Sequence, residues 1–196
     1  VYNYASINST SVFMPHTGID EFTKQMDLSP NLLFMVAFSI VLSRISREEN
    51  VMFSCASHGR YDKRLMDAYG MFVRTLPVKV NLKVDNSLRT LADELTDEIA
   101  FNRANAIYPY THLCSDLYGT SAPKPVVYNY FGEQIRNYAD IEGVHYPSQF
   151  VNSKVSDEEL VCQVYVHPES YELRMSSSQS RYSTKFLVKF GLAIKA

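Results

Sequence analysis

The helix predicted over residues 31–45 constrains the fold most, because its apolar side chains lie almost all round it. Ser29 can accept hydrogen bonds from the free amides of the first turn, and Pro30 stands where a missing amide hydrogen costs nothing. A helix without a polar face is covered on more than one side in the folded protein. A short apolar strand, residues 51–56, follows it. The two elements predict a layered arrangement with this helix in the interior.

Helices and strands alternate through most of the chain, and two strands follow one another near its end. Residues 78–84 alternate between apolar and polar side chains, as in a strand with one buried face. Ser87 and Ser183 each precede an amphipathic stretch and are expected to cap a helix. Strands are predicted at residues 11–14, 51–56, 71–84, 126–131, 160–166 and 171–175, and helices at residues 19–26, 31–45, 61–69, 88–99, 111–118 and 184–194. This order predicts an α/β fold with a mixed β-sheet packed by helices.

Three further expectations concern the connections. Tyr108-Pro109 is expected to end the helix that starts at residue 88, because proline lacks an amide hydrogen and restricts the residue before it. Residues 119–125 are expected to form a loop, and residues 132–150 to be irregular. Pro168, between the last two strands, is expected to form a tight turn and so an antiparallel hairpin.

Length and charge limit the classes of partner. With 196 residues, 46% of them hydrophobic, the chain can bury about two-thirds of its unfolded surface in one core. This indicates one domain or one lobe of a larger one. The formal net charge is −2, and basic and acidic residues are spread evenly along the chain. Neither nucleic acid nor an anionic membrane is therefore an expected partner.

The cysteines indicate a reducing compartment. Cys55, Cys114 and Cys162 form no C-x-x-C pair, so we expect reduced thiols in a cytoplasmic protein, without a disulfide framework or a zinc site. The longest largely apolar run, residues 32–42, has about half of the ~20 residues that span a bilayer. No basic segment followed by an apolar one opens the chain, so no secretory signal is expected.

Several patterns could suggest catalysis, but each has a simpler structural explanation. Cys55 and His58 could form a thiol and its base, although a cysteine in a buried strand is the commoner case. His112 and Cys114 lack a third ligand, which favours ordinary packing. The remaining histidines are interpreted as solvated or structural: His16, His145 and His167.

The sequence also contains no convincing motif for binding a metal ion or a nucleotide. A carboxylate cluster on the helix after residue 88 is expected to be a solvated face: Asp93, Glu94, Asp97 and Glu98. The glycines form no phosphate-binding loop and no G-x-S-x-G elbow. We therefore expect no metal, no directly bound cofactor and no serine-hydrolase chemistry.

Residues 29–79 carry a longer pattern: a buried helix, an apolar strand, the pair Gly59-Arg60, and then the block Gly70-Met71-Phe72-Val73-Arg74-Thr75-Leu76-Pro77-Val78-Lys79. In order and spacing this resembles the condensation domains of nonribosomal peptide synthetases, which belong to the chloramphenicol acetyltransferase-like superfamily. The family block reads Gly-x-Phe-Val-Asn-Thr-x-x-x-Arg. This chain has Arg74 in place of the asparagine and Lys79 in place of the closing arginine, which keeps the charge but loses the planar fork.

The resemblance extends over nearly the whole chain. Tyr108-Pro109-Tyr110 matches the end of the family motif His-Gln-x-Tyr-Pro-Phe, without its His-Gln. Residues 126–131 resemble a later core strand of the family, and residues 171–194 resemble its closing strand and helix. The resemblance therefore implies that residues 1–196 are the C-terminal lobe of such a domain. The family's His-His-x-x-x-Asp-Gly motif is expected in the other lobe, and this chain has no adjacent histidine pair.

The resemblance also implies a function. Condensation domains form amide bonds between acyl and aminoacyl groups held as thioesters on phosphopantetheine arms of carrier proteins, in a tunnel between two lobes. The partners implied are the N-terminal lobe and the donor and acceptor carrier proteins. This lobe is expected to hold no catalytic residue and to be inactive alone. It would supply tunnel residues, Arg74, Thr75 and Asn129, and a structural motif, Gly59, Arg60, Gly70, Phe72, Tyr108 and Pro109.

Three alternatives remain at this point. The parent protein could be an epimerisation or cyclisation relative, whose own motif would also lie outside this chain. The chain could be a noncatalytic module that docks carrier proteins, which Arg74 at the asparagine position makes more plausible. The similarity could also be one of fold alone, because a fold does not determine chemistry.

Overall fold

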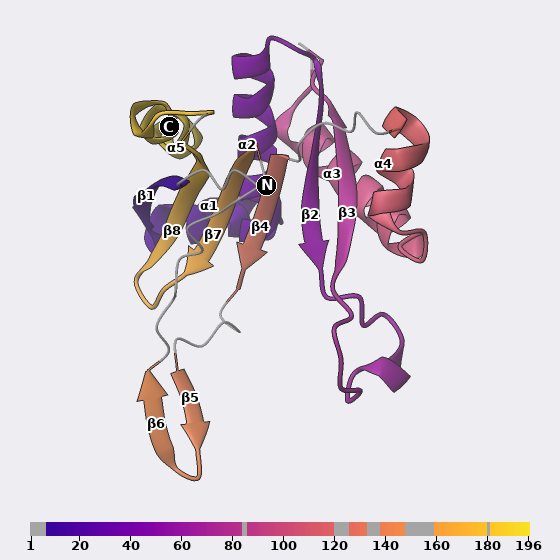
Figure 1. The fold of residues 1–196 in the computed structure, drawn as a ribbon. Coiled ribbons are helices and arrows are strands. Elements are labelled where there is room, and N and C mark those ends of the chain that lie inside the picture. The colour runs from indigo at the N-terminus through magenta and orange to yellow at the C-terminus, as the bar shows by residue number, and fades with distance from the viewer. Residues whose placement is uncertain (1–6, 84–85, 120–125, 133–137, 148–158, 180) are drawn as a thin grey trace. The chain divides into compact units, whose positions relative to one another are not determined.

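The computed structural model describes residues 7–83, 86–119, 126–132, 138–147, 159–179 and 181–196 (Figure 1). The chain forms two compact units. The central unit is Thr17–Asn129, and the terminal unit combines Val1–His16 with Tyr130–Ala196. Each unit is described by itself.

Helix α2 (Pro30–Ser46) confirms the predicted interior helix of the central unit. The Ser29 side chain accepts from the Leu32 amide at 3.2 Å, which is the predicted cap. Val36 and Phe38 are completely buried. The helix ends at Arg47, which has a left-handed backbone and donates its amide hydrogen to the carbonyl oxygen of Ser43. Helix α1 (His16–Met26) precedes α2, close to the predicted 19–26.

The strands of the central unit form a mixed sheet, as predicted. Strand β2 (Asn50–Ser57) pairs along its whole length with the antiparallel strand β3 (Arg74–Asn81). On its other side β2 pairs in parallel with β4 (Val126–Phe131). Alternate residues of β3 are buried, namely Leu76, Val78 and Val80, as the period-two pattern predicts.

Two helices complete this unit. Helix α3 (Leu88–Ala104) packs against β3 and α2 and buries Leu91 and Leu95. The Ser87 side chain accepts from the Thr90 amide at 3.1 Å, so this cap is also confirmed. The chain then turns at Tyr108-Pro109, as predicted, and continues as α4 (Tyr110–Tyr118).

An aromatic cluster forms the core of the central unit. The rings of Phe38 and Phe53 meet edge to face, with centroids 5.3 Å apart, and the Tyr128 ring lies 5.6 Å from Phe38. The hydroxyl of Tyr128 donates to the backbone oxygen or the side-chain oxygen of Asn31, each 3.1 Å away. A buried tyrosine with a satisfied hydroxyl thus links β4 to the start of α2.

In the terminal unit, β8 (Ser170–Ser178) lies between β1 (Ile7–Pro15) and β7 (Leu160–Val166), and both pairings are antiparallel. The predicted hairpin is confirmed, and its turn is closed by the His167 amide donating to Ser170 at 2.9 Å. Helix α5 (Thr184–Lys195) packs on β1 and β8, capped by Ser183 as predicted. A Cβ at Gly191 would lie 3.0 Å from Val12, so the helix approaches the sheet closely there.

Two local predictions were wrong, and a third was right in type but too long. The helix predicted at residues 61–69 is only a single 3-10 turn, Lys63–Leu65. The strand predicted over residues 71–84 covers Arg74–Asn81, and residue 84 lies outside the described residues. The segment predicted to be irregular, 132–150, contains the hairpin β5 (Tyr138–Ile141) and β6 (Val144–Pro147). Residues 120–125 of the predicted loop lie outside the described residues.

The wrong predictions have identifiable causes. The Leu65 carbonyl, which would accept from the Tyr69 amide in an α-helix over residues 61–69, accepts from Arg60 instead. The β5–β6 turn places Glu142 and Gly143 at positive φ, and a Glu-Gly pair is a weaker hairpin signal than Asn-Gly or Asp-Gly.

Within the described residues, no single helix is long and apolar enough to cross a membrane. Helices α1 and α2 pass that test only as a pair bent by 96°, by length and composition alone.

Candidate functional site

The carboxyl end of β2 is where the structure places the predicted tunnel residues. Because β2 and β4 are parallel, their carboxyl ends lie at the same edge of the sheet, and the antiparallel β3 begins there. In open α/β sheets, ligands bind outside the carboxyl ends of strands. We call the residues at this edge the carboxyl-edge site: Ala56, Ser57, Arg74, Thr75 and Asn129.

A side-chain hydrogen bond marks this edge. Strands β2 and β4 are in register at Ser54 with Val127 and at Cys55 with Tyr128. At the next residue, the Ala56 amide donates to the side-chain oxygen of Asn129 at 3.0 Å. A side-chain oxygen thus takes the place of a backbone carbonyl of β4 as the acceptor. The regular backbone hydrogen bonding between β2 and β4 ends at this residue.

The three predicted tunnel residues lie together around two residues of β2. On β3, Thr75 is the pairing partner of Ala56 of β2, and Arg74 is the pairing partner of Ser57. Asn129 contacts Ala56 from β4. Arg74 and Thr75 are exposed, and Asn129 is half-buried.

The chemistry available at this site is hydrogen bonding and positive charge. The guanidinium of Arg74, the amide nitrogen of Asn129 and the hydroxyl of Thr75 can donate to carbonyl oxygens. The thiol of the neighbouring Cys55 is no nucleophile, because burial, only partly offset by Arg103, raises its pKa to about 11. The Cys55–His58 pair is therefore structural, and His58 accepts the Arg60 amide hydrogen through Nδ1 at 2.9 Å.

Between β2 and β3 the chain makes an excursion over residues 58–73, which we call the Arg60 loop. Its first bend needs glycine, because Gly59 has φ +68° and a Cβ there would lie 1.7 Å from the backbone oxygen of Phe72. The guanidinium of Arg60 donates to the carbonyl oxygens of Leu65, Ala68 and Gly70. It also lies 4.4 Å above the centre of the Phe72 ring. Four members of the predicted structural motif are therefore in mutual contact, a grouping that their order in the sequence does not reveal.

The other two members of that motif lie at the start of α4. Pro109 occupies the N-cap position with φ −65°, although it offers no side-chain cap. The Tyr108 hydroxyl donates to the carboxylate of Asp116, which lies near the end of α4. This hydrogen bond raises the pKa of Tyr108. The tyrosine therefore links the residues before α4 to the last turn of that helix.

Among the described residues, no cluster of three or more histidine, cysteine or acidic side chains could hold a metal ion. The predicted solvated face of α3 is exposed at Asp93, Glu94 and Asp97. Glu98 differs from the prediction, because it is half-buried and accepts from the Asn102 side chain at 2.9 Å and the Lys79 amide at 3.3 Å.

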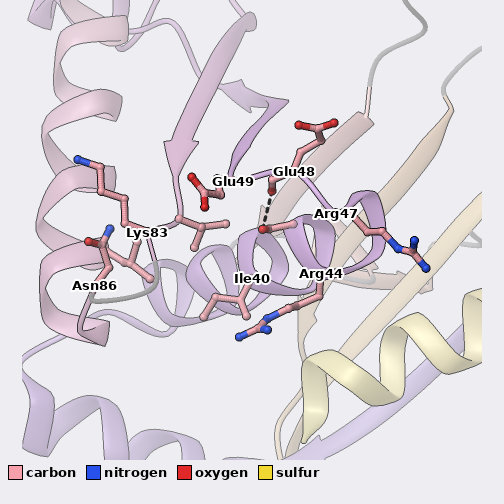
Figure 2. A pocket seen from close by; sticks show the side chains of 10 residues that line it. Ile40, Arg44, Arg47, Glu48, Glu49, Lys83 and Asn86 are labelled. Atoms are coloured by element: carbon pink, nitrogen blue, oxygen red, sulfur yellow. Dashed lines mark hydrogen bonds between the residues drawn. The ribbon is translucent and has the colours of Figure 1, made fainter.

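A pocket of about 480 Å³ lies at the opposite end of β2 (Figure 2). Its lining is Ile40, Ser43, Arg44, Arg47, Glu48, Glu49, Leu82, Lys83, Asn86 and Leu91. The side chains of Arg47 and Lys83 extend away from each other in Figure 2. Three cations and two carboxylates that do not converge on one point indicate a solvated groove, and none of the predicted site residues lines it.

The terminal unit contains a buried polar group that the sequence did not single out, the Glu172 cluster: Ser11, His167, Glu172 and Arg174. Glu172 is 5% exposed. Ser11 donates to one carboxylate oxygen at 2.6 Å, and Arg174 donates to the same oxygen through two nitrogens at 3.0 and 2.9 Å. The ring nitrogen Nε2 of His167 lies 2.8 Å from the other oxygen.

These contacts set the ionisation of Glu172. Burial alone raises its pKa, but hydrogen bonds from Ser11, His167 and Arg174 outweigh burial and hold the pKa below its usual range. The predicted structural role of His167 in the turn is confirmed. In addition, its ring joins the turn to a buried carboxylate. A charged residue in the middle of a strand was the only signal in the sequence.

The family model for condensation domains matches residues 13–191. The chain belongs to the condensation-domain family. The match includes the carboxyl-edge site, the Arg60 loop and most of the terminal unit. A search of curated proteins found no match.

Solved condensation domains have the same fold. The first condensation domain of the CDA synthetase aligns with 99% of this chain at 14% identity and a TM-score of 0.76. The starter condensation domain of rhizomide synthetase aligns with 100% at 14% identity and a TM-score of 0.78. The X-domain from teicoplanin biosynthesis aligns with 96% at 12% identity and a TM-score of 0.77.

The chain spans 45% of each of the first two structures and 46% of the third. It therefore has the fold of one lobe of a condensation domain, and the predicted α/β lobe of the chloramphenicol acetyltransferase-like fold is confirmed.

Proposed function

We propose that this chain is the C-terminal lobe of a nonribosomal peptide synthetase condensation domain, and that its carboxyl-edge site lines the path of carrier-bound acyl and aminoacyl thioesters. The single observation that carries the proposal is that Arg74, Thr75 and Asn129 all lie beside the last residues of β2, at the carboxyl edge of the sheet. The order of motifs along the sequence supports the C-terminal assignment.

The role proposed for the site is to position the substrates. Arg74, Thr75 and Asn129 offer donors for the carbonyls of a phosphopantetheine arm or of an acyl chain, and none of the three is a general base near neutral pH. The base is assigned to the family's adjacent histidine pair, which this chain lacks. The lobe is therefore inactive alone and needs the N-terminal lobe and two carrier proteins.

The experiment uses the full-length protein with both lobes and carrier proteins loaded with donor and acceptor. Amide product is followed by mass spectrometry of the acceptor arm. We expect Asn129→Ala to lower product formation about tenfold, because it removes both the substrate donor and the acceptor of the Ala56 amide. Lys185→Ala, an exposed change on α5, is the matched control. Unchanged product formation in Asn129→Ala contradicts the role of the site.

A second candidate function is a noncatalytic docking module. Two observations favour it: Arg74 replaces the family asparagine, and the X-domain is among the similar folds. An X-domain has been solved as a complex with OxyB. The same assay separates the two functions, because a docking module binds carrier protein and gives no new amide. Product with an inverted residue or a ring would instead indicate an epimerisation or cyclisation relative.

A further inference from the structure

The Arg60 loop is held by polar contacts much more than by a buried core. Tyr69 and Met71 are 103% and 91% exposed, and Met66 and Val73 are also exposed. Residues 62–68 form only short-range backbone hydrogen bonds, such as the Leu65 amide to the Asp62 oxygen at 2.9 Å. Hydrophobic burial therefore cannot account for one defined path of this loop.

Arg60 supplies the long-range ties. Its Nη1 donates to the carbonyl oxygens of Leu65 and Ala68, and its Nη2 donates to the carbonyl oxygen of Gly70 at 3.2 Å. One half-buried side chain thus gathers three carbonyls from the far side of the loop. A planar guanidinium with several donors suits this task, whereas a lysine ammonium has neither the plane nor the reach.

The same side chain determines how the loop leads into β3. The Phe72 ring lies under the guanidinium, 4.4 Å from its central carbon. The backbone oxygen of Phe72 occupies the space where a Cβ of Gly59 would be, so the two ends of the loop touch. Arg74 is two residues beyond Phe72, and its Cγ would lie 3.2 Å from the same Cβ. The start of β3 is therefore held both by its pairing with β2 and by the contacts of the preceding Phe72 with Arg60 and Gly59.

We propose that Arg60 is a positioning residue, which folds the loop around its guanidinium and so holds Arg74 and Thr75 in their arrangement before substrate binds. This inference rests on the proposed function for its link to substrate, but the ordering of the loop does not depend on it. Without Arg60 the loop samples several paths, and only the fraction with Arg74 and Thr75 in place is competent to bind. The apparent affinity for substrate falls by that fraction, while turnover of the bound complex is retained.

The test compares Arg60→Ala and Arg60→Lys in the full-length protein with both lobes. Arg64→Ala is the matched control, because Arg64 is a cation of the same loop whose side chain is 88% exposed and pairs with its neighbour Asp62. The first measurement is amide hydrogen exchange over residues 61–73. We expect exchange about tenfold faster in Arg60→Ala, an intermediate increase in Arg60→Lys and no change in Arg64→Ala.

The second measurement is the amide-forming reaction with acceptor carrier protein as the varied substrate. We expect KM to rise about tenfold in Arg60→Ala with kcat within about twofold, because the loss lies in the competent fraction. A purely structural role would leave both constants unchanged once the protein is folded. Phe72→Leu, which removes only the ring beneath the guanidinium, is expected to give a smaller rise in KM and covers the case in which Arg60→Ala fails to fold.

The outcomes separate the inference from the function on which it rests. Unchanged exchange over residues 61–73 in Arg60→Ala overturns the ordering role of Arg60. Faster exchange with unchanged KM and kcat overturns its link to the site. If the unaltered protein forms no amide product, the proposed function fails, and with it the link to substrate, while the exchange measurement still decides the ordering of the loop.

Discussion

The Arg60 loop and the Glu172 cluster are each built around one charged side chain, but the groups that bind the two charges differ. Arg60, in the central unit, is bound by three backbone carbonyls and an aromatic face. Glu172, in the terminal unit, is bound by Ser11, His167 and Arg174. Backbone carbonyls are dipoles that do not titrate, whereas the carboxylate of Glu172 can be neutralised by acid.

The two groups also differ in burial, and burial decides how far a change spreads. Glu172 joins β1, β8 and the turn before β8, and it is almost fully buried. Arg60 is half-buried and joins parts of one loop. We therefore expect changes at Glu172 to alter the stability of the terminal unit and changes at Arg60 to alter local order. The predictions below test this contrast in full-length protein.

The largest effect is expected from Glu172→Gln, which leaves Arg174 and His167 facing a neutral amide. Removing one partner of a buried ion pair is strongly destabilising, and we expect a loss of about 3 kcal/mol, at the low end because Arg174 remains partly exposed. Urea unfolding followed by circular dichroism measures the change. Glu169→Gln is the control, because Glu169 is an exposed carboxylate of the same turn. Equal stabilities of the two variants would contradict the contrast.

The same carboxylate is expected to make stability depend on pH. Its pKa is lower in the folded chain than in the unfolded chain, so the folded chain binds fewer protons. The stabilisation is complete above the ordinary carboxyl pKa of about 4.3 and is lost as the pH falls through the folded value. The difference in unfolding free energy between the unaltered protein and Glu172→Gln should therefore shrink below about pH 4. A difference that stays constant down to pH 2.5 would show that folding does not lower the pKa of Glu172.

The sequence predicted the strands around the Glu172 cluster better than it predicted their contacts. The proline turn indicated the hairpin of β7 and β8, yet Glu172 meets Ser11, which is 161 positions away in the chain. No local pattern contains that pairing. The carboxyl-edge site was anticipated only as three residues of a resemblance, because the pairing of β2 with β3 and β4 depends on long-range register.

The Arg60 loop shows why a local pattern can also mislead. Residues 61–69 have a polar side and were predicted to be helical, but Arg60 binds the carbonyls of Leu65 and Ala68. Arg60 lies outside this segment but binds carbonyl oxygens within it, so the segment alone does not reveal the competing contact. Gly59 and Arg60 were singled out only by the family resemblance, and their contacts give that pair a physical role.

The smaller stability effect is expected at the bend that precedes Arg60. In Gly59→Ala, the new Cβ would meet the backbone oxygen of Phe72 at 1.7 Å, and φ of +68° is strained for alanine. Residues held in left-handed backbone cost about 1–3 kcal/mol, so we expect a loss of about 2 kcal/mol, less than at Glu172. Amide hydrogen exchange should show the change concentrated in residues 57–74, where β2 meets β3. A uniform change over both units would mean that the loop is part of the global core.

Gly18→Ala is the matched substitution, and its effect on stability is expected to have the opposite sign to that of Gly59→Ala. Gly18 lies inside α1, and a Cβ there would meet no atom within 4 Å. Glycine within a helix is less favourable than alanine by about 0.5–1 kcal/mol, so this variant should be more stable than the unaltered protein. Opposite signs for two identical substitutions would tie the cost at Gly59 to its positive φ and its contact with Phe72, neither of which Gly18 has. If both variants lost stability equally, the close approach of Gly59 to Phe72 would not be the cause.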